Sequence, residues 1–298
     1  MLRLTFTISS QKFFSQDWEG CLLKNSCSHC PLITRVKVLA TTTNNLPMSL
    51  PLKLAHSRYT QQARWTAELR SHLFAEAGIA SAQRILDVGC GTGAVLGTII
   101  HGPRTELHGL DIDIAALAWA KSEDKDAHFG CGDAHHLPYR RATFDIVFFH
   151  FVLLWLKHAE IAVSEARRVT KPGGVLIAFA EPDYGGRIDH PNGFSRLAEW
   201  QKEALQARGA DPCIGRRIRE VFHDADLHNV QSGVLGAEWS DAQASEESEL
   251  EWEVMEQDLA GRVDPEEMAK YRELDTNSRN VGERVLYVPT FFAWAKVN

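Results

Sequence analysis

The feature that most constrains this chain is the stretch from Arg84 to Leu96, which reads RILDVGCGTGAVL. It opens with a short apolar run of the kind buried in a parallel sheet. Gly89, Gly91 and Gly93 follow at once. Glycine reaches positive φ and lets a ligand approach the backbone, and residues beyond the loop can open a helix whose free N–H groups face that ligand. The stretch therefore predicts a strand, a tight loop and a helix that together bind a small molecule.

Two kinds of cofactor fit this loop. Gly89, Gly91 and Ala94 satisfy the loose dinucleotide fingerprint, in which glycine or alanine follows two glycines at fixed spacing. Asp87 argues against a dinucleotide, because its carboxylate would repel a pyrophosphate but attract a sulfonium or an amino group. On these residues DVGCGTG resembles the first motif of the class I S-adenosylmethionine-dependent methyltransferases, and later segments extend the resemblance.

A second predicted strand, Glu106 to Leu110, ends in Asp111, 22 residues beyond Gly89. A carboxylate at this position accepts two hydrogen bonds from ribose hydroxyls, which serves NAD and S-adenosylmethionine equally well. We expect Asp111 to have no competing partner in the local sequence. Asp113 is predicted to cap the following helix.

Residues 128–139, HFGCGDAHHLPY, distinguish the two cofactors. They resemble the methyltransferase segment in which an acid binds the adenine amino group and the next backbone N–H meets a ring nitrogen. The resemblance places Asp133 and Ala134 in these roles. The adjacent His135 and His136 would point apart in an extended segment, and too few further ligands accompany them, so we expect no metal.

Two later features of the family occur in order. Phe144 and Asp145 begin the predicted fourth strand, and residues 171–174, Lys-Pro-Gly-Gly, form a turn before the fifth. The resemblance covers residues 57–181 closely. It implies an α/β fold with a Rossmann-like, seven-stranded, mostly parallel sheet, helices on both faces and C-terminal helical lid insertions. The last strand, predicted over 284–294, should be antiparallel with a bulge at Pro289.

The resemblance implies a site for S-adenosyl-L-methionine as cosubstrate. Tyr59 belongs to a leading helix, predicted from Ser57 to Ala77, that closes over the cofactor in many such enzymes. The implied cofactor-binding residues are Tyr59, Asp87, Gly89, Cys90, Gly91, Gly93, Asp111, Ile112, Asp133 and Ala134.

The predicted reaction is an in-line methyl transfer to a small molecule. The sulfonium is already a good leaving group, so orientation of the acceptor, which contributes up to roughly 7–11 kcal/mol, is the main task of the protein. A general base is optional, and His150, Asp183 and Tyr184 are the candidates, because they follow the fourth and fifth strands. His150 also fits a core histidine, and Asp183 a turn residue. A nicotinamide-dependent oxidoreductase and a non-catalytic, methyltransferase-like binding protein remain alternatives.

Composition bears on partners and compartment. The 298 residues carry a net charge of −7, which argues against a broad nucleic-acid face. No apolar run approaches the roughly 20 residues of a membrane helix. Six scattered cysteines favour a reducing compartment, the cytoplasm. We therefore expect a small-molecule methyl acceptor, with no nucleic acid and no membrane, whereas the oligomeric state stays open.

The chain divides into two parts. Residues 1–54 hold six Lys or Arg against two acids and lack a sustained period, so they are interpreted as a disordered leader or a mis-called start, with organelle targeting by residues 1–47 left open. Residues 55–298 form the predicted methyltransferase domain, with lid elements at about 185–226 and 241–275. Within the second lid element Trp252, Met255 and Leu259 recur at helical spacing, and we expect them to pack over the acceptor.

Overall fold

The computed structural model describes residues 50–236 and 245–298, without the side chains of 245 and 246. Two compact units divide the chain, Met1–Leu46 and Pro47–Asn298, and all described residues belong to the second. The predicted leader therefore lies outside the described residues except for 50–54. No helix in the described ranges is both long and apolar enough to cross a membrane.

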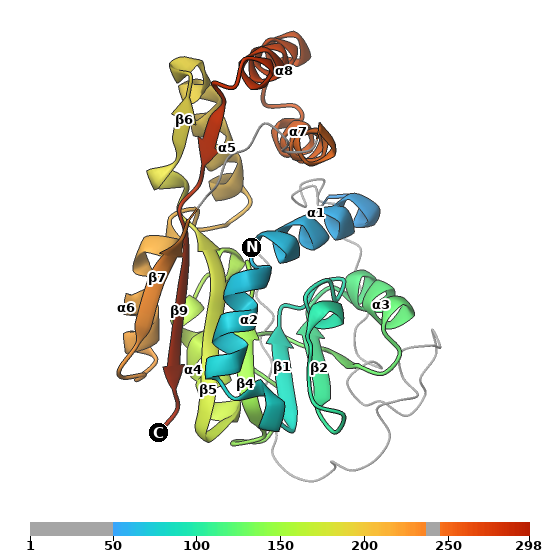
Figure 1. The fold of residues 1–298 in the computed structure, drawn as a ribbon, viewed down its shortest axis with the longest axis vertical. Helices are drawn as coiled ribbons and strands as arrows, with labels where there is room; N and C mark the ends of the chain where they lie inside the picture. Colours follow the sequence, from blue (N-terminus) through green and yellow to red (C-terminus); the bar gives the residue numbers. More distant parts are fainter. Residues whose placement is uncertain (1–49, 237–244) are drawn as a thin grey trace, which may run out of the picture. The chain divides into compact units, whose positions relative to one another are not determined.

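A seven-stranded sheet with strand order β3-β2-β1-β4-β5-β9-β7 forms the centre of the fold (Figure 1). Its strands are β1 (Arg84–Val88), β2 (Glu106–Asp111), β3 (His128–Cys131), β4 (Phe144–Phe149), β5 (Thr170–Pro182), β7 (Gln231–Leu235) and β9 (Thr290–Lys296). Neighbours run parallel except where β9 is antiparallel to β5 and β7. The predicted Rossmann-like sheet is confirmed, including its antiparallel last strand.

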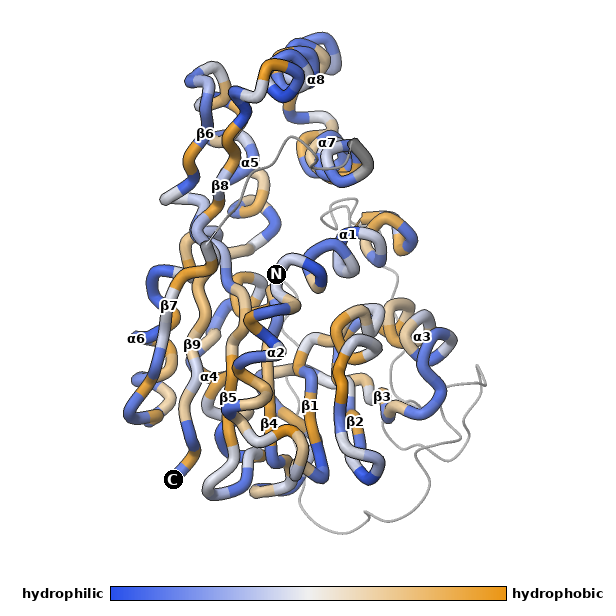
Figure 2. Tube along the Cα trace, viewed as in Figure 1, coloured by the Kyte–Doolittle hydropathy of each residue, from blue (hydrophilic) through white to orange (hydrophobic). Residues whose placement is uncertain are grey.

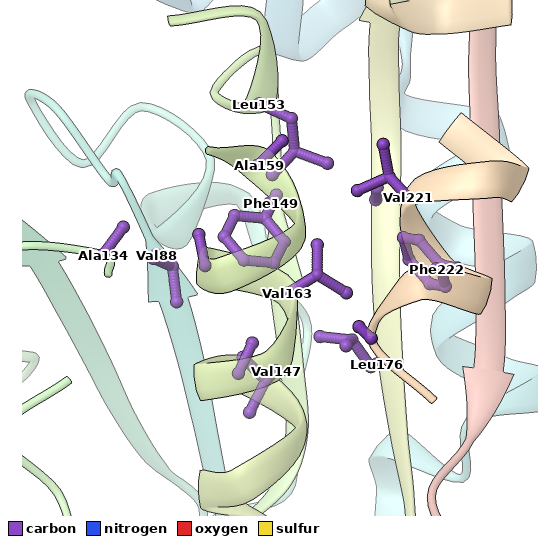
Figure 3. Packing of buried hydrophobic residues seen from close by; sticks show 14 of the residues in the cluster. Val88, Ala134, Val147, Phe149, Leu153, Ala159, Val163, Leu176, Val221 and Phe222 are labelled. Carbon is purple, nitrogen blue, oxygen red and sulfur yellow. The ribbon is translucent and has the colours of Figure 1, made fainter. Parts of the chain in front are cut away.

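Side chains alternate along β4, so both faces of the sheet are buried. Val147 and Phe149 point to the face covered by α4 (Ala159–Val169) and α6 (Ile218–Asp224), as Figure 3 shows. Ile146 and Phe148 belong to the opposite layer. Helices on both faces explain why the central strands read as continuous apolar runs rather than as alternating ones.

The opposite layer is formed by α2 (Ala67–Glu76) and α3 (Ile114–Glu123). Phe74 of α2 meets Phe148 and Phe179 edge to face, with ring centroids 5.5 and 4.9 Å apart. Edge-to-face pairs add about 0.5–1.5 kcal/mol to the burial of each ring. Figure 2 shows the resulting concentration of hydrophobic residues along β1, β4 and β5.

The predicted leading helix is interrupted. It forms α1 (Leu52–Trp65) and then α2, with the break at Thr66. The Thr66 hydroxyl donates to the carbonyls of Gln62 and Ala63, and the buried Arg70 guanidinium donates to Ala63 as well. Carbonyls freed by the break are thus satisfied by side chains. The break lets α1 leave the sheet while α2 packs against it (Figure 1).

The helix predicted beyond Gly93 does not form. The chain makes turns and one short 3₁₀ helix, Leu96–Thr98, before β2 begins. Gly97, Gly102 and Pro103 lie within this connection. Glycine and proline disfavour helix interiors, so the segment has no uninterrupted run long enough for a stable α-helix.

A separate group of elements, which we call the cap, lies beyond the carboxyl edge of the sheet (Figure 1). Its members are β6 (Ile188–His190), α5 (Ser195–Ala207), α7 (Ser245–Leu259), α8 (Pro265–Asn280) and β8 (Val285–Tyr287). β6 and β8 pair antiparallel in a sheet of their own. The predicted last strand over 284–294 is therefore two strands, separated at residues 288 and 289.

Two predictions about the lid need correction. Trp252, Met255 and Leu259 are buried in the core of the cap itself, and only Met255 among them also lines a cavity. The first lid element, predicted to reach residue 226, includes α6, whose Val221 and Phe222 are buried against α4 and the sheet. Periodicity reports that a helix has an apolar face, but not which surface that face contacts.

Because α6 belongs to the sheet layer, Val221→Ala should destabilise the whole domain. The loss of two buried methyl groups should cost about 2 kcal/mol of unfolding free energy. The matched control is Arg219→Ala on the exposed side of α6, which should stay within about 0.5 kcal/mol. Urea denaturation measures both, and equal stabilities would contradict the assignment of α6.

Candidate active site

A cavity of about 940 Å³ opens at the carboxyl edge of the parallel strands. In an open α/β sheet this edge is where ligands bind. Nine of the ten sequence-predicted cofactor residues line it, and Gly93 does not. They are Tyr59, Asp87, Gly89, Cys90, Gly91, Asp111, Ile112, Asp133 and Ala134.

The glycine loop has no room for side chains where it borders this cavity. Gly89 has φ +79°, and a Cβ there would come within 2.6 Å of a Val152 methyl. Gly91 has φ +52°, and a Cβ there would lie 3.0 Å from the Tyr59 ring. Tyr59 therefore lies directly on the loop, and His56 also holds α1 to it by a 2.9 Å hydrogen bond to Thr92 Oγ1. Glycine is therefore favoured at position 91 for two reasons, the positive φ of its backbone and the close approach of Tyr59 from α1.

Asp87 is the most unusual group in the cavity. It is 2% exposed, and its Oδ1 has no hydrogen-bond partner among the described residues. Burial and the neighbouring Asp111 raise the pKa of Asp87 well above its usual value, although Arg70 opposes this. A buried, unpaired carboxylate oxygen fits the amino group of a cationic ligand. A pyrophosphate would instead meet like charge, so this geometry disfavours a dinucleotide.

Asp111 has local partners that the sequence did not predict. Its Oδ2 accepts the Gly91 N–H at 2.7 Å, and its Oδ1 accepts the Asp113 N–H at 2.9 Å. Burial raises the pKa of Asp111 although these hydrogen bonds oppose the shift. The carboxylate thus fixes the glycine loop while facing the cavity. Asp113 caps α3 as predicted, accepting from Ala115 and Ala116.

Asp133 also has a partner. Its Oδ1 accepts the His135 N–H at 2.9 Å and lies 2.7 Å from His135 Nδ1. Burial alone would raise the pKa of Asp133, but the bonds from His135 outweigh it and lower the pKa. Nothing in the described ranges groups three or more His, Cys, Asp or Glu side chains so that they could hold a metal ion.

A second cavity of about 350 Å³ lies between the sheet edge and the cap. It adjoins the first, because Arg58, Phe151, Pro182 and Tyr184 line both. Cap residues also reach the larger cavity, where Val254, Gln257 and Asp258 of α7 line its wall. The cofactor contacts implied by the resemblance all precede residue 151, so sequence reasoning missed the contribution of α7.

Two of the three candidates for a general base, His150 and Asp183, form hydrogen bonds with neighbouring protein groups. His150 lines the larger cavity, but its Nε2 is 2.8 Å from Thr66 Oγ1, and burial lowers its pKa to about 3. Asp183 is buried, caps the turn at Gly185, and binds Arg216 through both carboxylate oxygens. Asp183 lines neither cavity, so its geometry is that of a turn residue.

Tyr184 is the base candidate that borders both cavities. Burial raises the pKa of its phenol, although the charges of Arg58 and Arg187 oppose the shift. A phenol that keeps its proton at neutral pH is suited to donate a hydrogen bond rather than to remove a proton.

Glu181 is a structural residue that the sequence did not reveal. It is fully buried at the end of β5, and its carboxylate accepts the backbone N–H groups of Val152, Leu153 and Leu154 at 2.9–3.0 Å. Burial raises its pKa to about 7 despite these bonds. Glu181 thus joins β5 to the loop after β4, whose Phe151 and Val152 line the larger cavity.

The strand order, the glycine loop after β1 and the acids near the ends of β1 and β2 are typical of α/β domains that bind a nucleotide-containing cofactor. Residues 86–178 match the family model described as a methyltransferase domain. This part of the chain is therefore a methyltransferase domain, and its strand order and glycine loop are those expected of the class I S-adenosylmethionine-dependent type.

Two curated relatives are similar over part of the chain. An uncharacterized methyltransferase of Schizosaccharomyces pombe is 34% identical over 48% of this chain and 55% of its own length. A malonyl-[acyl-carrier protein] O-methyltransferase of Herminiimonas arsenicoxydans is 28% identical over 63% of this chain and 76% of its own. The chain thus spans about half the length of the first relative.

Among solved structures, the fold resembles a chain from the Haloferax volcanii complex that contains the Trm112 methyltransferase activator. The TM-score is 0.52 at 17% identity, over 82% of this chain and 95% of that one. A match at this level of sequence identity shows a similar fold and nothing further.

Proposed function

We propose that this protein transfers the methyl group of S-adenosylmethionine to a small molecule held beneath the cap. The observation that carries the proposal is the pair of adjoining cavities. One is lined by the glycine loop and its flanking acids, and the other is enclosed by cap residues. When bound, the cofactor would supply an electrophilic methyl on a good leaving group.

The residues of this chain have separate roles in that proposal. Asp87 holds the amino group of the cofactor, Asp111 its ribose, and Asp133 with Ala134 its adenine. Tyr59 covers the glycine loop from α1. Tyr184 and Arg58 stand at the junction of the two cavities, where the acceptor would meet the methyl group. Orientation and exclusion of water are then the main contributions of the protein.

A small-molecule acceptor is supported by the limited size of the second cavity, about 350 Å³. The malonyl-[acyl-carrier protein] O-methyltransferase relative supports transfer to oxygen of a carboxylic acid as one form of the reaction. We further propose that the cap, rather than the range 185–226 as a whole, selects the acceptor, because α5, α7, α8 and β8 supply much of the cavity wall.

Asp111→Ala tests the cofactor site directly. The loss of charge-assisted hydrogen bonds should lower affinity for S-adenosylhomocysteine by about 1.5–3 kcal/mol, which calorimetry of the full chain measures. Asp126→Asn, an exposed site outside the cavity, is the control and should bind like the parent. Equal affinity in the Asp111 variant would remove Asp111 from the site, and no binding by the parent would overturn the proposed function.

A further inference from the structure

Arg58 stands out at the junction of the two cavities because its charge is not matched by a carboxylate. Its Nη1 donates to the neutral Gln61 Oε1 at 2.7 Å, and its guanidinium lies over the Trp65 ring at 4.7 Å. Among the acids whose side chains the structure describes, none forms an ion pair with Arg58. An arginine in this position has donors left for a ligand.

The acids near Arg58 each have another arginine. Glu251 pairs with Arg279 at 3.5 Å, Asp258 with Arg208 at 2.5 Å, and Glu247 with Arg64 at 3.6 Å. Burial raises the pKa of Glu251, and Arg58 is the largest charge opposing that shift. Arg58 therefore acts on this part of the cavity as a surplus cation.

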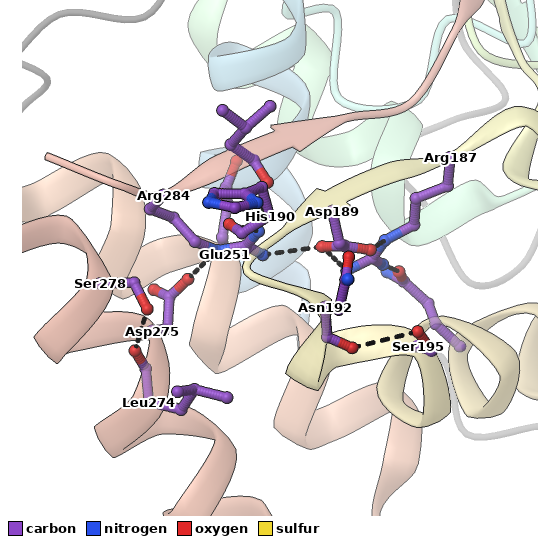
Figure 4. Close-up of polar contacts among 12 residues, drawn as sticks. Arg187, Asp189, His190, Asn192, Ser195, Glu251, Leu274, Asp275, Ser278 and Arg284 are labelled. Carbon is purple, nitrogen blue, oxygen red and sulfur yellow. Dashed lines mark hydrogen bonds and ion pairs between the residues drawn. The ribbon is translucent and has the colours of Figure 1, made fainter.

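The other arginines that line the second cavity are already neutralised. Figure 4 shows Arg187 and Arg284 bound to Asp189, and Arg284 also bound to Asp275. Arg279 is 2.8 Å from Asp275 as well. Arg187, Arg279 and Arg284 thus face Asp189, Asp275 and Glu251, three charges against three. This network stabilises the cap and leaves Arg58 as the cation available to a ligand.

The remaining wall of the second cavity is mixed. Trp65, Val254, Met255 and Leu286 contribute apolar surface, whereas Glu247 and Glu251, each paired with another arginine, also line it. The apolar side chains can contact the hydrocarbon body of a ligand whose charged group lies at Arg58.

We propose that the acceptor is an acidic small molecule with an apolar body, whose carboxylate or phosphate binds Arg58 at the junction of the two cavities. This inference rests on the proposed function and names the substrate class of the same site. A guanidinium binds planar or tetrahedral oxyanions through paired N–H groups, which gives orientation as well as attraction. The anion would place the acceptor at a fixed distance from the cofactor.

The test uses the full chain saturated with S-adenosylhomocysteine. Hexanoate, benzoate and phenyl phosphate are titrated by ligand-observed NMR against their neutral counterparts hexanamide, benzamide and phenol. The anions should bind at least about tenfold more tightly than the neutral compounds. Tighter binding of phenyl phosphate than of the two carboxylates would indicate an acceptor that carries a phosphate. Tighter binding of hexanoate and benzoate would indicate a carboxylic acid.

Variants then assign the effect to Arg58. Arg58→Met should weaken anion binding by about tenfold or more, whereas Arg58→Lys should recover part of it. Lys53→Met is the matched control, since Lys53 is an exposed cation on the same helix that lines neither cavity, and it should bind anions like the parent.

Three results would overturn the inference while S-adenosylhomocysteine still binds: no anion binds, the neutral compounds bind equally, or Arg58→Met binds anions like the parent. Failure of S-adenosylhomocysteine itself to bind would instead overturn the proposed function, and the inference with it.

Discussion

Asp87→Asn should bind S-adenosylhomocysteine far more weakly than the parent and yet be more stable at neutral pH. The ligand ammonium would lose its buried counter-charge, which typically costs 2–5 kcal/mol or more. The free protein would gain, because the carboxylate is buried with an unpaired oxygen and its pKa is raised. A residue that costs stability but increases affinity is expected at a binding site.

The sign of the pH dependence follows from that raised pKa. Between the unfolded value near 3.8 and the raised folded value, the folded chain holds a proton that the unfolded chain has lost. The stability of the parent therefore falls as pH rises through this window. The advantage of Asp87→Asn should be absent near the low end of the window and should grow with pH, as melting temperatures would show.

Binding provides an independent measurement. A cationic ligand favours ionised Asp87, so the parent should release a proton on binding, and its affinity should rise with pH. Calorimetry in buffers of different ionisation enthalpy counts that proton, and Asp87→Asn should not release it. The exposed Asp126→Asn serves as the control. Proton release equal to that of the parent in the Asp87 variant would contradict the assignment.

Arg284→Met should destabilise the cap by about 3–5 kcal/mol, the usual cost of removing one partner from a buried ion pair. Arg284 Nε is 2.6 Å from Asp275 Oδ1, and its Nη2 is 2.9 Å from Asp189 Oδ1. Its guanidinium also lies 3.9 Å from the centre of the Phe194 ring. Burial would raise the pKa of Asp275, but hydrogen bonds from Trp252, Arg279 and Arg284 lower it. Removing Arg284 withdraws one of these bonds.

Hydrogen exchange separates the cap from the sheet in this experiment. Amides of α7 and α8 should lose protection in Arg284→Met, while those of β1 and β4 should keep it, because the two regions have distinct cores. Arg196→Met is the control, since Arg196 and Glu199 form a solvent-exposed pair whose loss should leave the protection of the cap unchanged. Equal protection of the cap in both variants would mean that the network contributes little.

Local sequence determined the parts of this protein that depend on neighbouring residues. The apolar runs of β1, β4 and β5 and the positive φ of Gly89 and Gly91 are properties of a few adjacent residues, so the strands and the loop were predictable. Asp87 and Asp111 lie at or next to the last residues of β1 and β2, which their place in the sequence already indicated. Parallel strands bring those ends to one edge, which is why the candidate cofactor residues could be identified together.

Contacts between distant residues decided the rest, and only the tertiary structure contains them. Glycine and proline stop the expected helix after Gly93, but the break at Thr66 depends on carbonyls that Arg70 and Thr66 satisfy. The cap network joins Asp189 to Arg284, 95 residues apart. Arg58 and Arg64 lie on the same helix, but Arg64 pairs with Glu247, whereas Arg58 lines both cavities and has no ion pair with a described carboxylate. Sequence spacing does not encode such pairings, because their energies depend on burial and distance, which arise only once the chain has folded.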